Sequence, residues 1–260
     1  MYNPSFRVKR NGVPILSGEQ ISIIGEKYVR DFQPEVLQNP APVDIESFIE
    51  QYLGMTPDYQ YLSHNGIYLG MTVFNDTNRV IVYSPQTERA EYISAKARTV
   101  IIDNRLLEEN QQHRYRFTLG HEGGHDIFHS GYYSYNPNQL SFLDTPLPPM
   151  IQCRVDNQSV KKPTKKWDDH DWMEWHANRF ASSILMPETS VRLIASGYSQ
   201  DSIAKSLLTR YRLVMEVADT FDVSYEAATY RLKDLGILAK DDQTDYSSNS
   251  AFLDFAEIAM

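Results

Sequence analysis

Apolar residues at helical spacing predict two helices in the N-terminal part of the chain. The first covers residues 21–32, where apolar side chains recur every three or four positions before Pro34 interrupts the pattern. The second follows Asp44, a residue type that caps helix N-termini, and ends before Gly54, a residue type common just past a helix. We therefore expect a helical N-terminal region.

Strand-like patterning follows, in short runs of β-branched and aromatic residues separated by turn residues. Such runs lie at residues 59–64, 67–74, 79–83 and 98–103. Between the first two stands Asn65-Gly66, a pair that supplies the positive φ angles of a two-residue hairpin turn. We therefore expect a hairpin across this pair, in a small and mostly antiparallel sheet with helices before and after it.

Two longer helical patterns occupy the middle of the chain. The first covers residues 111–129 and is expected to end at Gly131, and the second covers 171–186 and stops at Pro187. The segment 132–170 between them holds five of the 13 prolines and predicts an irregular insertion. Together with the sheet, these helices indicate an α+β fold.

Three or four short helices are predicted after Pro187. Residues 217–228 resemble a helix-turn-helix, with Ser224 as the N-cap of its second helix. The segment 241–260 carries five acidic residues and neither Lys nor Arg, so we expect it to be an acidic, disordered tail. The chain is therefore expected to end in a small helical region and a tail.

Composition and charge narrow the classes of function. Apolar residues make up 42% of the 260 positions, which excludes a mainly disordered chain. The net charge of −9 argues against a protein that coats nucleic acid. No apolar run is long enough to cross a membrane, and the basic N-terminus lacks the apolar stretch of a secretory signal. We therefore expect a cytoplasmic protein without membrane contact.

The histidines indicate metal binding. With 7 histidines and one cysteine, the chain can form no multi-cysteine zinc site, so any metal is expected to be held by histidines and carboxylates. The motif HEGGH at residues 121–125 places His121 and His125 on one face of a helix, roughly 6 Å apart along its axis. Both can reach one zinc ion, and in this motif Glu122 is the general base toward the metal-bound water. The alternative is a helix with two solvated histidines.

Glu174 is the best candidate for a third ligand. It lies among small residues at the edge of the apolar stripe of the later helix, where a carboxylate is costly to bury without a positive partner. Asn178 lies on the same face and could accept a hydrogen bond from a ligand histidine, which would fix its tautomer. We expect this helix to dock at Gly124, between the motif histidines. The alternative for Glu174 is a partly exposed residue that the helix dipole favours.

Two paired motifs resemble those of the ImmA/IrrE metallopeptidases. The first is RFTLGHEGGH at residues 116–125, and the second is EWHANRFA at 174–181 followed by ILMP at 184–187. The order of two helices, a small sheet, the histidine-bearing helix and the glutamate-bearing helix is also similar. The chain departs from the family in a longer spacer between the motifs, and Asn178 stands where related zinc peptidases place an aspartate.

The resemblance implies a gluzincin-like zinc fold. It implies that His121, His125 and Glu174 hold Zn²⁺ and that Glu122 is the catalytic residue of a zinc-dependent endopeptidase. It also implies that the natural substrate is a protein, namely a helix-turn-helix transcriptional repressor. Asn178 can accept a hydrogen bond as aspartate does, but it cannot stabilise charge on an imidazole.

The resemblance covers roughly residues 18–240, and the organisation of the chain predicts three parts. A zinc metallopeptidase domain covers residues 1–197, with the insertion at about 132–170, and a small helix-turn-helix-like region covers 198–240 before the tail at 241–260. An oxyanion donor is needed for peptide hydrolysis. The candidates are Tyr132, Tyr133, His129 and His176. His129 lies too far along the helix to share a metal with His121, so we interpret it as a helix-end histidine or one that contacts a ligand.

Two alternative functions remain open. The C-terminal helices could bind DNA, but residues 201–240 carry six basic and six acidic side chains, which favours a packing role and makes direct nucleic-acid binding unexpected. The other alternative is a zinc-bound sensor that sequesters a regulator without cleaving it. Glu122 argues against a sensor, because a pure binding site needs no general base.

Overall fold

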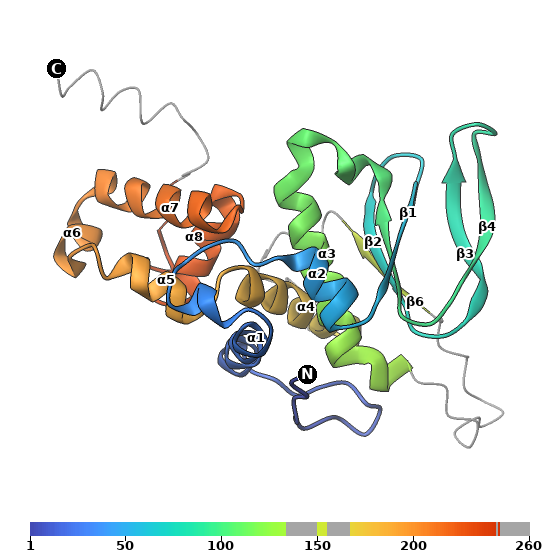
Figure 1. Cartoon of the computed structure of the whole chain (residues 1–260), viewed down its shortest axis with the longest axis horizontal. Coiled ribbons are helices and arrows are strands. Elements are labelled where there is room, and N and C mark those ends of the chain that lie inside the picture. The colour runs from blue at the N-terminus through green and yellow to red at the C-terminus, as the bar shows by residue number, and fades with distance from the viewer. Residues whose placement is uncertain (134–149, 155–166, 243, 245–260) are drawn as a thin grey trace.

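The computed structural model describes residues 1–133, 150–154, 167–242 and 244. The fold is α+β, as the sequence predicts. Figure 1 shows the strands gathered at one end of the molecule and the C-terminal helices at the other, with the longer helices between them. Most of the insertion expected at 132–170 and most of the tail expected at 241–260 lie outside the described residues.

The helices are α1 (Gly18–Phe32), α2 (Ile45–Ser47), α3 (Gln112–Tyr133), α4 (Asp169–Leu185), α5 (Glu188–Ala195), α6 (Gln200–Lys205), α7 (Leu207–Phe221) and α8 (Tyr225–Asp234). Short 3₁₀ turns lie at Pro34–Leu37, Asn104–Leu107 and Glu109–Gln111, and a π-helical turn at Phe48–Tyr52 continues α2. The caps predicted from sequence are present. Asp44 accepts a hydrogen bond at the start of α2, and Ser224 does so at the start of α8. Gly54, just past the π-helical turn, has a φ of +70°.

The strands of the described residues form two sheets. They are β1 (Thr56–Gln60), β2 (Tyr68–Val73), β3 (Thr77–Ser84), β4 (Arg89–Ala95), β5 (Thr99–Asp103) and β6 (Met150–Arg154). Four of them form a mixed sheet in the order β1-β5-β2-β6, in which β1 and β5 are parallel and the other pairs antiparallel. The other two form the β3–β4 hairpin. This arrangement differs from the single, mostly antiparallel sheet that the sequence pattern predicts.

The hairpin predicted across Asn65-Gly66 is wrong. The strand before this pair contacts β5 rather than β2, and only Gly66 has a positive φ. Two side chains at the end of β5 and in the 3₁₀ turn that follows it explain the difference, because they bind the backbone of the intervening segment. Asp103 accepts a hydrogen bond from the backbone N–H of Leu62, and Arg105 donates to the carbonyl oxygens of residues 63 and 64. These backbone groups are therefore satisfied outside a β-ladder.

Four further elements differ from the sequence-based expectation. β4 was not predicted, because it is exposed along most of its length and lacks an apolar run. β6 lies inside the segment expected to be irregular, where it completes the sheet by pairing with β2. α3 continues through Gly131 to Tyr133, and α4 begins two residues earlier than expected because Asp168 and Asp171 form a capping box.

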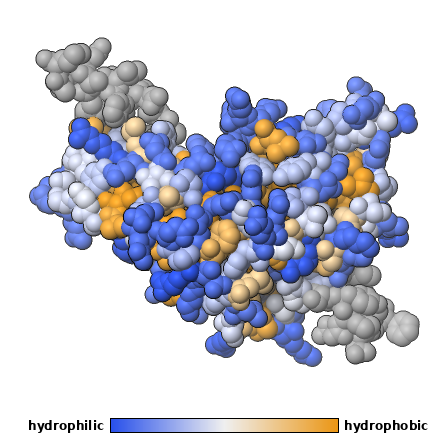
Figure 2. All heavy atoms as spheres, viewed as in Figure 1, coloured by the Kyte–Doolittle hydropathy of each residue, from blue (hydrophilic) through white to orange (hydrophobic). Residues whose placement is uncertain are grey.

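Close contact between α3 and α4 forms the centre of the fold. A Cβ atom added to Gly124 would lie 3.1 Å from the Cα of Ala177, and one added to Gly120 would lie 3.3 Å from the Cα of Ala181. Glycines facing alanines therefore let the two helix backbones approach, as the sequence predicts for Gly124. Among the described residues, no helix combines the length and the apolar character that crossing a membrane requires. Figure 2 shows hydrophilic side chains over most of the visible face, with small apolar patches between them.

Two buried arginines join the C-terminal helices to the rest of the molecule. Arg231 of α8 donates to the carbonyl oxygen of Met186 at 2.9 Å and to the hydroxyl of Ser22 at 3.0 Å. Arg116 of α3 donates to the carbonyl oxygens of Val43 and Phe221. Because buried guanidinium groups need such partners, these contacts connect α7 and α8 to α1, α3 and α4.

The helix contact predicts opposite effects for two glycines of α3. We expect Gly124→Ala to lower the free energy of unfolding by about 1–3 kcal/mol, because its methyl group would press on the backbone of Ala177. Gly131→Ala is the matched control, since among the described residues nothing lies within 4 Å of its added Cβ. It should raise that free energy by up to about 1 kcal/mol through helix propensity. Chemical denaturation measures both, and a Gly124→Ala variant as stable as the parent would contradict the close contact.

Candidate metal centre

The three ligands expected from sequence come together where α3 packs on α4. The Nε2 atoms of His121 and His125 lie 2.9 Å apart. The Glu174 carboxylate lies 3.5 Å from Nε2 of His121 and 3.3 Å from Nε2 of His125. All three side chains are buried, and their ligand atoms lie within 4.8 Å of one another. Together they form a cluster that can hold one metal ion.

The protonation of His121 supports this reading of the cluster. The side-chain oxygen of Asn178 lies 2.9 Å from Nδ1 of His121, the contact expected from their spacing. An amide oxygen only accepts hydrogen bonds, so Nδ1 carries a proton, and Nε2 is the ring nitrogen that faces His125 and Glu174. Buried lone pairs and a carboxylate that converge on one point repel one another unless a cation lies among them. The residues therefore fit a metal ion.

A row of histidines continues from the cluster. Nδ1 of His125 lies 2.9 Å from Nδ1 of His129, and Nε2 of His129 lies 3.4 Å from Nδ1 of His176. Burial lowers the pKa of both His125 and His176 to about 4, so their neutral forms dominate at neutral pH. His129 thus contacts the candidate ligand His125 at Nδ1, the ring nitrogen that does not face His121 and Glu174.

Glu122 is buried beside the cluster with its two oxygens in different surroundings. The hydroxyl of Thr72 on β2 donates to Oε2 at 2.6 Å, whereas Oε1 has no hydrogen-bond partner among the described residues. Oε1 faces Gly70, where an added Cβ would lie 2.5 Å from it. Burial raises the pKa of Glu122 to about 7, which suits a group that accepts and releases a proton near neutral pH. Sequence reasoning missed Thr72, because the pairing of β2 with its neighbours is not readable from periodicity.

Two further side chains near the cluster were not predicted. His170 is half exposed, and its Nε2 lies 3.9 Å from Oε1 of Glu174. It stands four residues before Glu174, so the helical spacing could have indicated it. Cys153 on β6 is buried and hydrogen-bonded with His121. Because the segment around β6 was expected to be irregular, the contact between Cys153 and His121 was not predicted.

The two tyrosine candidates for an oxyanion donor belong to the end of α3. Tyr133 stacks on Phe74, with ring centroids 4.3 Å apart, and Tyr132 packs edge-on against Tyr133. Tyr133 is buried, and its backbone carbonyl accepts a hydrogen bond from the side chain of Asn75. These contacts place both rings in the packing between α3 and the segment after β2.

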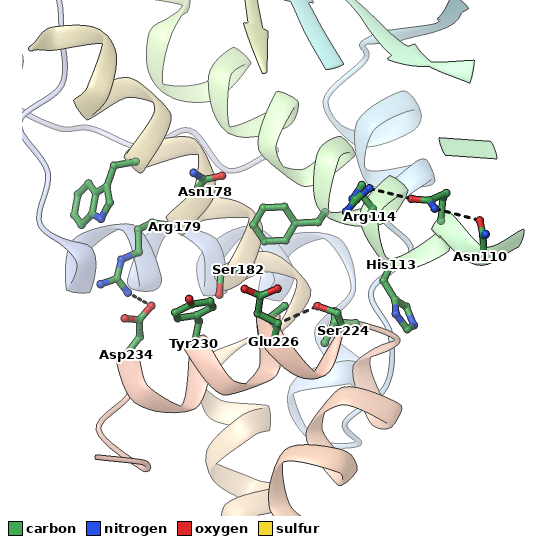
Figure 3. Close-up of a pocket in the computed structure, with 15 residues that line it drawn as sticks. Asn110, His113, Arg114, Asn178, Arg179, Ser182, Ser224, Glu226, Tyr230 and Asp234 are labelled. Atoms are coloured by element: carbon green, nitrogen blue, oxygen red, sulfur yellow. Dashed lines mark hydrogen bonds and ion pairs between the residues drawn. The ribbon is translucent and has the colours of Figure 1, made fainter. Parts of the chain in front are cut away.

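A cleft of about 410 Å³ lies between the start of α3, α4 and α8 (Figure 3). Its walls combine charged side chains with the aromatic rings of Phe117, Trp175 and Tyr230. Asn178 lines this cleft, whereas the three candidate metal ligands do not. Among the described residues that line the cleft, Asn178 is the one that contacts a candidate ligand, His121.

The buried carboxylate of Glu122 predicts a pH-dependent stability in the metal-free protein. Because burial raises its pKa from 4.5 to about 7, the folded protein holds this proton more tightly than the unfolded chain. Stability should therefore fall as the pH rises from 4.5 to about 7, and Glu122→Gln should abolish that loss. We expect the variant to gain roughly 3 kcal/mol on the parent across this window. Denaturation with chelator present measures the gain, and a difference independent of pH would contradict the burial argument.

Comparison with known proteins bears on the helix that carries Glu174. The family model of the IrrE N-terminal-like domain, Peptidase_M78, matches residues 157–233. This stretch includes Glu174 and Asn178, whereas His121 and His125 precede it. No curated protein matches the chain. The family match confirms the resemblance of this chain to the ImmA/IrrE metallopeptidases.

Proposed function

We propose that the protein is a zinc-dependent endopeptidase that hydrolyses a peptide bond of a protein substrate. The observation that carries the proposal is the buried convergence of His121, His125 and Glu174 beside Glu122. Two imidazoles and one carboxylate are a ligand set that catalytic zinc sites use, with one further position left for water. The match to a peptidase family supports the same class of activity.

Zinc held by these three side chains would supply Lewis-acid polarisation of the substrate carbonyl and would make a nearby water more acidic. The residues of the chain move the proton. Glu122 accepts it from the attacking water at Oε1, the oxygen without a hydrogen-bond partner among the described residues, while Thr72 holds Oε2. Glu122 then donates the proton to the nitrogen of the leaving amine. Asn178 keeps the Nδ1 proton of His121 in place throughout.

A helix-turn-helix transcriptional repressor is the substrate class that we propose, and the resemblance to the ImmA/IrrE family supports it. Direct DNA binding through α8 is less well supported. Arg231 of α8 is buried against Met186 and Ser22, and Lys233 donates to the carbonyl oxygen of Asp242. These basic groups are therefore engaged within the protein rather than presented to phosphates.

Loss of the general base should separate proteolysis from sequestration. We expect Glu122→Gln to bind zinc like the parent but to cleave a purified repressor encoded nearby at least about 100-fold more slowly, because the amide cannot take the proton from water. Gel electrophoresis with and without chelator measures cleavage. If the variant cleaves as fast as the parent, Glu122 is not the base. If the parent binds the repressor without cleaving it, the protein is a sensor.

Orientation of His121 should affect metal affinity. We expect Asn178→Ala to bind zinc about 10- to 100-fold more weakly, because Nδ1 of His121 loses its acceptor. Asn178→Asp should retain the affinity, since a carboxylate accepts the same hydrogen bond. Ser182→Ala is the matched control, because Ser182 is four residues further along α4 and lines the same cleft. Competition with a chromophoric chelator measures these affinities, and equal values for parent and Asn178→Ala would contradict the orienting role.

A further inference from the structure

Two buried histidines lie beyond the candidate metal ligands and take no part in the proposed proton transfer. His129 stands about one helical turn after His125 on α3, and His176 lies two residues after Glu174 on α4. Both side chains are buried, with at most 1% of their surface exposed. Burying a polar imidazole is costly unless its ring nitrogens have hydrogen-bond partners. The partners of these two rings therefore indicate what the rings do.

The two rings continue a single row of imidazoles that starts at His125. Nε2 of His125 faces His121 and Glu174, so Nδ1 is the nitrogen directed away from the cluster. That Nδ1 lies 2.9 Å from Nδ1 of His129, and Nε2 of His129 lies 3.4 Å from Nδ1 of His176. Both ring nitrogens of His129 thus contact other imidazoles, and the row connects α3 to α4.

The row has only one possible direction of hydrogen bonding once a metal occupies the cluster. A neutral imidazole carries one N–H, and the nitrogen that binds a metal is the one without it. His125 would therefore bind through Nε2 and donate from Nδ1 to His129. His129 accepts at Nδ1, so its own proton lies on Nε2 and is donated to Nδ1 of His176. Each acceptor thereby holds the ring before it in a single tautomer.

We propose that His129 and His176 are positioning residues that orient the metal ligand His125, an inference that rests on the metal site of the proposed function. His129 acts on His125 directly, as Asn178 does on the other ligand histidine, and His176 acts through His129. The Phe128 ring packs against both positioning rings, with centroids 6.1 and 6.3 Å away. The packing of α3 on α4 therefore orients one ligand as well as bringing the third ligand into reach.

Two replacements of His129 test this role in the full-length protein. His129→Leu removes the acceptor, whereas His129→Asn places an amide oxygen near the position of Nδ1. We expect His129→Leu to bind zinc about 10- to 100-fold more weakly, and His129→Asn to stay within about threefold of the parent. His64→Leu is the control, because His64 is exposed and belongs to neither the cluster nor the row. Competition with a chromophoric chelator measures the affinities.

His176 should affect zinc binding only through His129. We expect His176→Leu to lower the affinity by about 3- to 10-fold on its own, but to have no effect when His129→Leu is already present, because the link to His125 is then broken. Nitrogen-15 NMR of the zinc-loaded parent reports the tautomers, which a merely structural role would not determine. We expect the ring proton on Nδ1 of His125 and on Nε2 of His129.

Each outcome decides a different part of the account. A parent that binds zinc no more weakly once His129→Leu is introduced overturns the positioning role but leaves the three-ligand site and the proposed function standing. A ring proton on Nδ1 of His129, or His129→Asn as weak as His129→Leu, also overturns the role. A parent that binds no zinc overturns both proposals. Zinc binding that follows the row, in a protein that cleaves no repressor, supports the positioning role and contradicts the endopeptidase.

Discussion

The close packing of α3 on α4 is the contact on which the candidate site depends. Gly120 and Gly124 face Ala181 and Ala177 so closely that the helix backbones nearly touch. Glu174 lies about one turn before Ala177, and this approach therefore brings its carboxylate to the motif histidines. A larger side chain at either glycine would push the helices apart and separate the carboxylate from the imidazoles. The small residues thus determine whether three ligands on two helices form one site.

Burial then sets the chemistry of the site. The side chains of the cluster are buried, so each polar group depends on a hydrogen-bond partner or on a bound ion. Asn178 contacts Nδ1 of His121, and His129 contacts Nδ1 of His125. Thr72 donates a hydrogen bond to one oxygen of Glu122 and leaves the other without a partner among the described residues. Nε2 of His121, Nε2 of His125 and the Glu174 carboxylate converge, and a cation among them would interact favourably with all three. The same burial raises the pKa of Glu122 to about 7, a value that would let this residue accept and release a proton near neutral pH.

Local patterns in the sequence predicted the parts of the structure that local interactions determine. The helices, the caps at Asp44 and Ser224, and the meeting of the HEGGH histidines with Glu174 all follow from helical spacing and residue type. Strand pairing does not, because partners far apart in the chain decide it. The hairpin expected at Asn65-Gly66 is absent since Asp103 and Arg105, about 40 residues away, bind that backbone.

Strand pairing between distant parts of the chain also explains why two residues near the cluster were not predicted. Thr72 and Cys153 reach the cluster from two strands that pair with each other across about 80 residues of chain. Neither carries a motif, and the prolines around β6 indicated an irregular segment. The expectation that only histidines and carboxylates could hold a metal followed from counting cysteines. Counting excludes a multi-cysteine site, but it does not reveal that the single thiol contacts a histidine of the cluster.

Zinc binding to the metal-free protein tests the central claim most directly, because the ligand cluster underlies every later step. Calorimetric titration of the parent, Glu174→Gln and the exposed control Glu226→Gln compares the three under one condition. The account predicts one zinc per chain in the parent and the control, and an affinity more than about 100-fold lower in Glu174→Gln. Equal affinity in Glu174→Gln and the parent would contradict it, because Glu174 would then not be a ligand.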